Sequence, residues 1–334
     1  MSASSTTESR PPPKSLARRL ITLAVFVIWI GLSVSILLEL GIRLLHLVPD
    51  NAPIQYDAIG GEESFSPKPG SHGHSLYGVL NEINSLGLRD RERPIEKAPG
   101  TIRVVVVGDS VTYAHGVPQE QSFCAQLETL LRARGRSYEV WNLGVEAYDS
   151  FNENARYERL APAIKPDQTI LMVMFNDLLP GPTDFRVTSA GTLSARGRKA
   201  PYPDSWRPFL ESSALFTKVM RVYGSMGDNP STWDPWKYYP AMELQLDRFL
   251  ATSNRLGSRV IIGLMSGLSP SGADYRALAA RLHGYAARKG VTFIGLGEVL
   301  GDNGSSALFL PGDSVHPNIE GHTKIARALA PLVQ

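Results

Sequence analysis

The chain has 334 residues, of which 43% are hydrophobic and 20% are charged, so it is long enough for one large domain or two modest ones with a sizeable core. Lys and Arg total 34 against 32 for Asp and Glu, and the resulting net charge of +2 argues against a nucleic-acid-binding protein. The single cysteine, Cys124, excludes an intramolecular disulfide and a zinc site made of cysteines, and its helical spacing with Leu127 and Leu131 predicts a place in the core.

A run of apolar residues lies close to the N-terminus. Leu20 to Leu38 includes neither a charge nor a proline, and as a helix it would be about 28 Å long, close to the hydrocarbon thickness of a bilayer. The basic residues that precede it are Arg10, Lys14, Arg18 and Arg19. By the positive-inside rule we expect a cytoplasmic, disordered tail over 1–19, one transmembrane helix over 20–45 and an extracytoplasmic remainder. A cleavable signal peptide is the alternative, but its apolar core is shorter (about 7–15 residues) and ends in a small-x-small site that is not evident here.

Residues 46–100 are rich in glycine and proline and show little hydrophobic periodicity, which predicts a loop-rich stalk in front of a domain over 101–334. His72 and His74 in this stalk are compatible with a metal pair. No carboxylate cluster accompanies them, so a solvated loop is the simpler interpretation.

From Thr101 onward, β-branched runs alternate with helical patterns. Residues 102–107 (IRVVVV) are typical of a strand buried on both faces, and we expect further strands at 138–143, 169–174, 259–264 and 291–294. We expect helices at 121–134, 152–160 with an end imposed by Pro162, 242–256, 275–289 and 320–332. This alternation predicts right-handed crossovers and a parallel sheet with helices on both faces.

An insertion over 178–240 interrupts the alternation after the third strand. It has a possible short helix at 212–226, three tryptophans (Trp206, Trp233 and Trp236) and a basic group (Arg186, Arg196, Arg198 and Lys199). Loops at the carboxyl end of a parallel strand often bind substrate or form a lid. The tryptophans could stack on sugar rings, line an acyl pocket or only hold the insertion together. The basic group is compatible with an anionic substrate or a solvated surface.

Two short motifs could carry chemistry. Gly108-Asp109-Ser110 follows the first strand, where Gly108 permits a sharp turn and Ser110 reaches the edge of the sheet. Near the C-terminus, Asp313 and His316 have a spacing that lets both side chains emerge on one side of a turn. A serine hydroxyl becomes a good nucleophile when an imidazole takes its proton, and a carboxylate on the other ring nitrogen fixes the tautomer. Taken alone, either motif is more often a turn or a helix cap.

Donors for the oxyanion of an acyl-transfer reaction follow two other strands. Gly144 comes after the second strand, where a glycine N–H can approach a substrate closely. Asn176 comes after the third strand, where its side-chain amide is a donor. His115, five residues after Ser110, either borders this site or has a structural role.

The order of these features resembles the SGNH (GDSL-type) hydrolase superfamily over about 102–332. The resemblance implies a flavodoxin-like three-layer α/β/α sandwich, preceded here by the transmembrane helix. It also implies that Ser110 is the nucleophile, that Asp313 and His316 are its acid and base, and that Ser110, Gly144 and Asn176 form the oxyanion hole. The segment Asn84–Arg89 looks like an element that precedes the domain in membrane-anchored members. Met174 and Ala147 stand where the family usually has glycine, which bears on local backbone more than on catalysis.

We therefore expect a single-pass, membrane-anchored serine esterase with its domain outside the cytoplasm. Its expected substrate is an O-acyl, most simply O-acetyl, ester on a small molecule or on cell-envelope carbohydrate or lipid, with no metal or organic cofactor and no nucleic acid involved. Two alternatives remain: an O-acyltransferase that passes the acyl group to a glycan hydroxyl, and an inactive anchored domain that binds a glycan or a partner.

Overall fold

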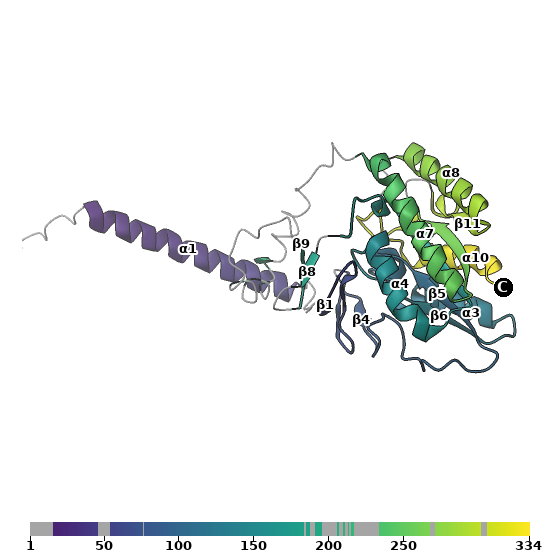
Figure 1. Cartoon of the computed structure of the whole chain (residues 1–334). Helices are drawn as coiled ribbons and strands as arrows, with labels where there is room; N and C mark the ends of the chain where they lie inside the picture. Colours follow the sequence, from purple (N-terminus) through teal and green to yellow (C-terminus); the bar gives the residue numbers. More distant parts are fainter. Residues whose placement is uncertain are drawn as a thin grey trace, which may run out of the picture. The chain divides into compact units, whose positions relative to one another are not determined.

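The computed structural model describes residues 16–45, 54–75, 77–183, 185–187, 191–195, 206, 210, 213, 215–216, 234–267, 271–301 and 306–334 (Figure 1). The chain divides into two units, one of residues 1–50 and 202–228 and one of residues 51–201 and 229–334.

The first unit is built on one long helix, α1 (Leu16–Leu44). The helix is long and apolar enough to cross a membrane, and its most apolar stretch buries none of its surface in the protein. It begins before residue 20, so residues 16–19 are helical where a disordered tail was expected, while 1–15 lie outside the described residues. Near its end, Glu39 accepts hydrogen bonds from Ser213 Oγ and the Leu215 N–H, each 2.8 Å long.

The second unit contains a five-stranded parallel sheet. The strands are β5 (Ile102–Val107), β6 (Tyr138–Asn142), β7 (Gln168–Val173), β10 (Arg259–Leu264) and β11 (Thr292–Gly295), and their spatial order is β11-β10-β7-β5-β6. Counted along the chain this is the 2-1-3-4-5 order of flavodoxin-like folds. The order reverses between β5 and β7, and ligands of such folds bind outside the carboxyl ends of the strands at this point.

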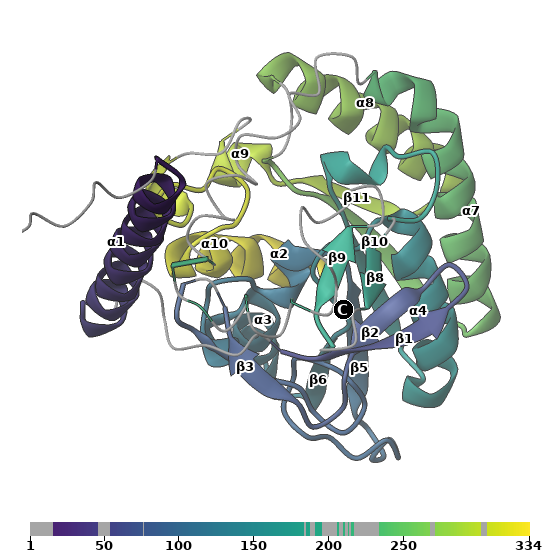
Figure 2. The same cartoon turned by 90° about the vertical axis from the view of Figure 1, so that its left-hand side faces the viewer.

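Helices cover both faces of this sheet, which confirms the expected three-layer sandwich (Figure 2). One face carries α4 (Ser150–Ile164), α7 (Tyr239–Arg255) and α8 (Gly272–Lys289), and the other carries α3 (Phe123–Arg132) and α10 (Ile319–Leu329). Val105 and Val107 point into the first layer, and Val104 and Val106 into the second. Burial on both sides explains why β5 is apolar without alternation. Cys124 lies in the second layer, as predicted.

Shorter elements complete the unit. The helices α2 (Ser110–Tyr113) and α9 (Gly297–Leu300) each form about one turn, and 3-10 turns lie at Gln119–Gln121, Phe175–Asp177, Pro235–Tyr238, Ser306–Leu308 and Ala330–Leu332. Three antiparallel pairs lie outside the main sheet: β1 (Tyr56–Gly60) with β2 (Ser64–Pro67), β3 (His72–His74) with β4 (Leu80–Glu82), and β8 (Phe185–Val187) with β9 (Leu193–Ala195).

Residues 54–75 and 77–100 have few regular elements, as expected of a loop-rich segment, but they pack on the sheet unit and do not form a stalk in front of it. Ile54 and Phe65 are buried, and they form a small core with Tyr113, Val145 and Tyr148, which flank the ends of β5 and β6. The strands of this segment have only three to five residues, which is too short to produce a recognisable period in the sequence. The segment is therefore part of the sheet unit.

Two further expectations differ from the structure or fall outside it. Helix α4 continues through Pro162 to Ile164, because Ala161 and Ile164 are buried in the core and the proline ring lies on the exposed side of the last turn. Several parts of the insertion lie outside the described residues. They are Trp233, Arg196, Arg198, Lys199, the side chain of Arg186 and most of the possible helix at 212–226. Trp236 packs against Phe175 with the two rings perpendicular.

Candidate active site

The two predicted motifs meet at the point where the strand order reverses. Ser110 begins α2 directly after β5, and His316 lies in the loop before α10. His316 Nε2 is 2.9 Å from Ser110 Oγ, and His316 Nδ1 is 2.7 Å from Asp313 Oδ2. The structure thus brings together a hydroxyl, an imidazole and a carboxylate in the order that activates a serine nucleophile.

The turn that holds Ser110 depends on the two residues before it. A Cβ at Gly108 would lie 2.2 Å from Thr112 Oγ1, so only glycine fits there. Asp109 caps α2, because its Oδ1 accepts the N–H of Val111 at 2.9 Å. Its Oδ2 accepts the side-chain N–H of Asn176 at 3.1 Å. Burial raises the pKa of Asp109 despite these hydrogen bonds.

Asp313 is held as a carboxylate by several donors. Its Oδ1 accepts the backbone N–H groups of Val315 at 2.7 Å and His316 at 3.0 Å, and its Oδ2 accepts the Tyr77 hydroxyl at 3.0 Å as well as the imidazole. Burial raises the pKa of Asp313, but the hydrogen bonds from the His316 ring and from these backbone N–H groups outweigh it, so the pKa lies below its usual value. A carboxylate in this state could stabilise a protonated imidazole at His316.

The expected oxyanion donors lie close to Ser110, but two of them have partners. The Gly144 N–H donates to Asn142 Oδ1 at 2.9 Å, and the Asn176 amide donates to Asp109 Oδ2 at 3.1 Å and to the Tyr148 carbonyl at 3.2 Å. Gly144 is required because a Cβ there would lie 2.3 Å from the Tyr113 nitrogen. Among the residues that the structure describes, the Ser110 N–H has no acceptor.

Both departures from the family pattern have local explanations. Ala147 adopts a left-handed conformation with φ of 64°, the backbone that a glycine would adopt without strain. Met174 is buried in the layer with α3 and α10. Its N–H donates to Asp177 Oδ2 at 2.8 Å, which fixes the turn that carries Asn176.

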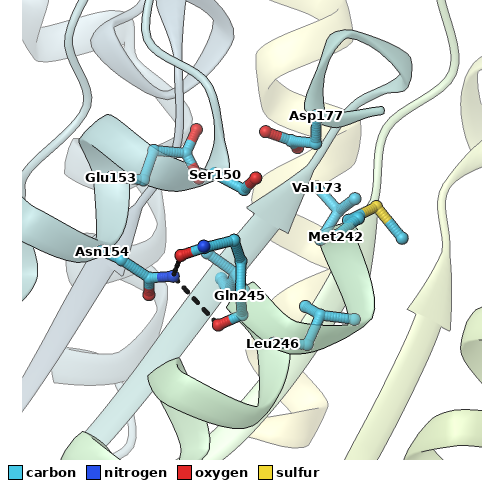
Figure 3. A pocket seen from close by; sticks show the side chains of 9 residues that line it. Ser150, Glu153, Asn154, Val173, Asp177, Met242, Gln245 and Leu246 are labelled. Carbon is cyan, nitrogen blue, oxygen red and sulfur yellow. Dashed lines mark hydrogen bonds between the residues drawn. The ribbon is translucent and has the colours of Figure 1, made fainter. Parts of the chain in front are cut away.

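A small cavity with room for about one water molecule lies behind this turn (Figure 3). Figure 3 shows the side chains of Ser150, Glu153 and Asp177 gathered around it. The Ser150 hydroxyl, both Glu153 oxygens and Asp177 Oδ1 are buried and have no hydrogen-bond partner among the described residues. Burial, together with the charge of Asp177, raises the pKa of Glu153 well above its ordinary value. Burial also raises the pKa of Asp177, and the cavity has room for a water molecule that could join these groups.

Three residues near the triad were not assigned to it from sequence. His115 Nδ1 lies 2.5 Å from Glu146 Oε1, and the rings of His115 and His316 are 4.6 Å apart between centroids. Tyr77 packs its edge against His115 and donates its hydroxyl to Asp313. Glu146 lies two residues after Gly144 in the sequence, which is only a weak indication that it lies near the site. Tyr77 lies in the glycine-rich segment, where nothing in the sequence indicates a role.

His72 and His74, for which a solvated loop was the simpler interpretation than a metal pair, lie on the separate β3–β4 hairpin, with His72 exposed and His74 half-buried. In the described part of the chain, no group of three or more His, Cys, Asp and Glu side chains is placed to hold a metal ion.

Comparison with known proteins identifies the family. The GDSL-like lipase/acylhydrolase family model matches residues 106–324. Similar solved structures include TesA (17% identity, TM-score 0.47, covering 70% of this chain and 98% of that one). Another is a catalytic mutant of Axe2, an acetylxylan esterase from Geobacillus stearothermophilus (19% identity, TM-score 0.45, covering 69% of this chain and 93% of that one). A third is the psychrotrophic esterase EstA from Pseudoalteromonas sp. (13% identity, TM-score 0.42, covering 68% of this chain and 92% of that one). A search of curated proteins finds no match. Because the family model covers well over half of the chain, the protein belongs to the GDSL-like lipase/acylhydrolase family and is an ester-hydrolysing serine hydrolase.

Proposed function

We propose that this protein is a membrane-anchored serine esterase that removes an O-acyl group, most simply acetyl, from a cell-envelope carbohydrate or lipid. The observation that carries the proposal is the chain of contacts from Ser110 Oγ to His316 Nε2 at 2.9 Å and from His316 Nδ1 to Asp313 Oδ2 at 2.7 Å. Helix α1 supports the anchor, and the basic residues before it support a cytoplasmic N-terminus and an extracytoplasmic catalytic unit.

In the acylation step, Ser110 Oγ attacks the ester carbonyl and His316 Nε2 takes the hydroxyl proton. Asp313 stabilises the imidazolium that forms. The Ser110 N–H donates to the tetrahedral oxyanion and stabilises it. The N–H groups of Gly144 and of the Asn176 side chain also donate to the oxyanion, and they are shared between it and their present acceptors, Asn142 and Asp109. His316 then gives its proton to the departing alcohol, and the acyl group remains on Ser110.

In the deacylation step, water occupies the place that the alcohol has left. His316 takes one of its protons, the hydroxide attacks the acyl carbonyl, and the proton returns to Ser110 Oγ as the carboxylic acid leaves. The same site could accept a glycan hydroxyl in place of water, which would make the protein an acyltransferase.

The test is an ester panel with the detergent-solubilised full chain. We expect kcat/KM to fall as the acyl group of 4-nitrophenyl esters lengthens from acetyl to octanoyl, and we expect acetate to be released from an acetylated polysaccharide. Ser110→Ala should abolish both activities. A preference for octanoyl would refute the acetyl assignment, and transfer of acetyl to an added glycan in place of acetate release would refute hydrolysis. No turnover of any ester would refute the esterase itself.

A further inference from the structure

A second histidine–carboxylate pair lies beside the proposed triad. His115 Nδ1 and Glu146 Oε1 are 2.5 Å apart, and Glu146 Oε2 also accepts the Tyr56 hydroxyl at 3.2 Å. Burial raises the pKa of Glu146, but the contacts with His115 and Tyr56 outweigh it and lower the pKa below its usual value. Glu146 is thus a carboxylate that accepts the Nδ1 proton, which leaves His115 Nε2 with a free lone pair when the ring is neutral.

The position of the His115 ring is fixed relative to Ser110. The His115 N–H donates to the Ser110 carbonyl at 3.0 Å, and the preceding Ala114 adopts a left-handed backbone with φ of 66°. A left-handed non-glycine residue is strained, and it persists where the surrounding contacts enforce it. The edge of the Tyr77 ring packs on His115, and its hydroxyl binds Asp313, so Tyr77 joins the two histidine–carboxylate pairs.

The His115 ring borders the space in which the ester must lie. Its centroid is 4.6 Å from that of His316, its side chain is 14% exposed, and Nε2 has no hydrogen-bond partner among the described residues. During acylation His316 Nε2 faces the leaving oxygen of the alcohol. With the two ring centroids 4.6 Å apart, a hydroxyl on the next carbon of that alcohol is within reach of the His115 ring.

We propose that His115, oriented by Glu146, binds the alcohol part of the ester by accepting a hydrogen bond from a hydroxyl next to the esterified oxygen. Two neighbouring ring nitrogens would then contact two neighbouring oxygens, and the enzyme would favour esters of polyhydroxylated alcohols over simple alkyl esters. This inference rests on the proposed Ser110 esterase and adds the part of the substrate that the triad does not recognise.

The test compares 1-acetylglycerol, which has a hydroxyl beside the ester, with propyl acetate, which has none. For the wild-type full chain in detergent we expect kcat/KM to be about 3- to 10-fold higher for 1-acetylglycerol, the effect of one added hydrogen bond. His115→Phe should bring this ratio to about one, and Glu146→Gln should lower it because the tautomer is no longer fixed. His283→Gln is the matched control, since His283 is an exposed histidine of α8, and it should keep the ratio.

The outcomes separate this inference from the proposed function. A wild-type ratio near one, or a ratio that both variants keep, would overturn the role of His115. An equal loss of rate on both esters would also overturn it, because it would show that His115 only positions His316. Turnover of 4-nitrophenyl acetate without turnover of 1-acetylglycerol would overturn the inference but leave the esterase standing. Failure to hydrolyse any of the three esters would overturn the esterase.

Discussion

Replacement of Arg89 by methionine should destabilise the catalytic unit strongly. Arg89 is 1% exposed, and its guanidinium donates 2.7 Å hydrogen bonds to the carbonyls of Tyr113, Ala114 and Val117. These three residues follow Ser110 and are themselves fully buried. Arg89 therefore ties the segment after the nucleophile to the segment that precedes the sheet.

The magnitude follows from the groups that lose a partner. A buried carbonyl left without a donor costs about 1–3 kcal/mol. The Ala114 carbonyl keeps the Val117 N–H as a donor at 3.2 Å, so the two carbonyls of Tyr113 and Val117 correspond to about 2–6 kcal/mol. Burial of the guanidinium itself is unfavourable, which lowers the pKa of Arg89, and relief of several kcal/mol of this desolvation offsets part of the loss. We expect a net loss of about 3 kcal/mol for Arg89→Met. Arg89→Lys keeps the charge but not the planar fork of donors and should lie between methionine and wild type.

Urea unfolding of the full chain in detergent, followed by tryptophan fluorescence, measures this loss. Arg91→Met is the matched control, because its side chain is 52% exposed and its partner Glu128 retains ion pairs with Arg93 and Arg132. The control should lose about 1 kcal/mol or less. If the Arg89→Met protein is as stable as the Arg91→Met protein, the buried hydrogen bonds of Arg89 do not stabilise the fold.

Three further predictions concern other residues. Asp313→Asn should lower kcat for 4-nitrophenyl acetate by about 10³- to 10⁴-fold, because the imidazolium loses its carboxylate, and a smaller loss than tenfold would contradict that role. Burial lowers the pKa of His322 from 6.5 to about 3, so the unfolded chain binds a proton at this residue first and the free energy of unfolding falls as the pH falls below 6.5. Urea unfolding should therefore show a loss of about 2 kcal/mol between pH 8 and pH 5 in the wild type but not in His322→Leu. An equal loss in the variant would contradict this role of His322. Gly144→Ala should lower both the thermal midpoint and the esterase rate, because the added Cβ would lie 2.3 Å from the Tyr113 nitrogen. Gly284→Ala, in the open middle of α8, should instead stabilise the protein by about 0.5–1 kcal/mol. Equal thermal midpoints for the two variants would contradict the close contact at Gly144.

Much of the sheet could be predicted because its signals are local. In the IRVVVV run of β5 the four consecutive valines, 104–107, face the two helical layers in turn, so burial on both faces is visible in the sequence. The functional motifs were also accessible, since each follows a strand end and parallel strands place those ends at one edge of the sheet. A local pattern thus predicted that Ser110 and Asn176 lie near one another.

The contacts made by the segment before the sheet could not be predicted in this way. Tyr77 meets Asp313 across 236 residues of sequence, and the two lie in loops without a period. Arg89 is fully buried although nothing in its neighbourhood predicts burial, because its partners are backbone carbonyls, which have no sequence signature. The predicted end of α4 before Pro162 is wrong for a related reason. The proline removes one backbone N–H donor, but burial of Ala161 and Ile164 in the core stabilises the last turn of the helix.

In the proposed reaction, Ser110 attacks the acyl carbon with His316 as its base. Mass spectrometry of tryptic peptides after treatment of the full chain with a fluorophosphonate tests it most directly. We predict one adduct on the peptide that contains Ser110, no adduct in Ser110→Ala, and slow labelling in His316→Ala. Labelling of another residue in the wild-type chain, or ester hydrolysis that survives Ser110→Ala, would show that Ser110 is not the nucleophile.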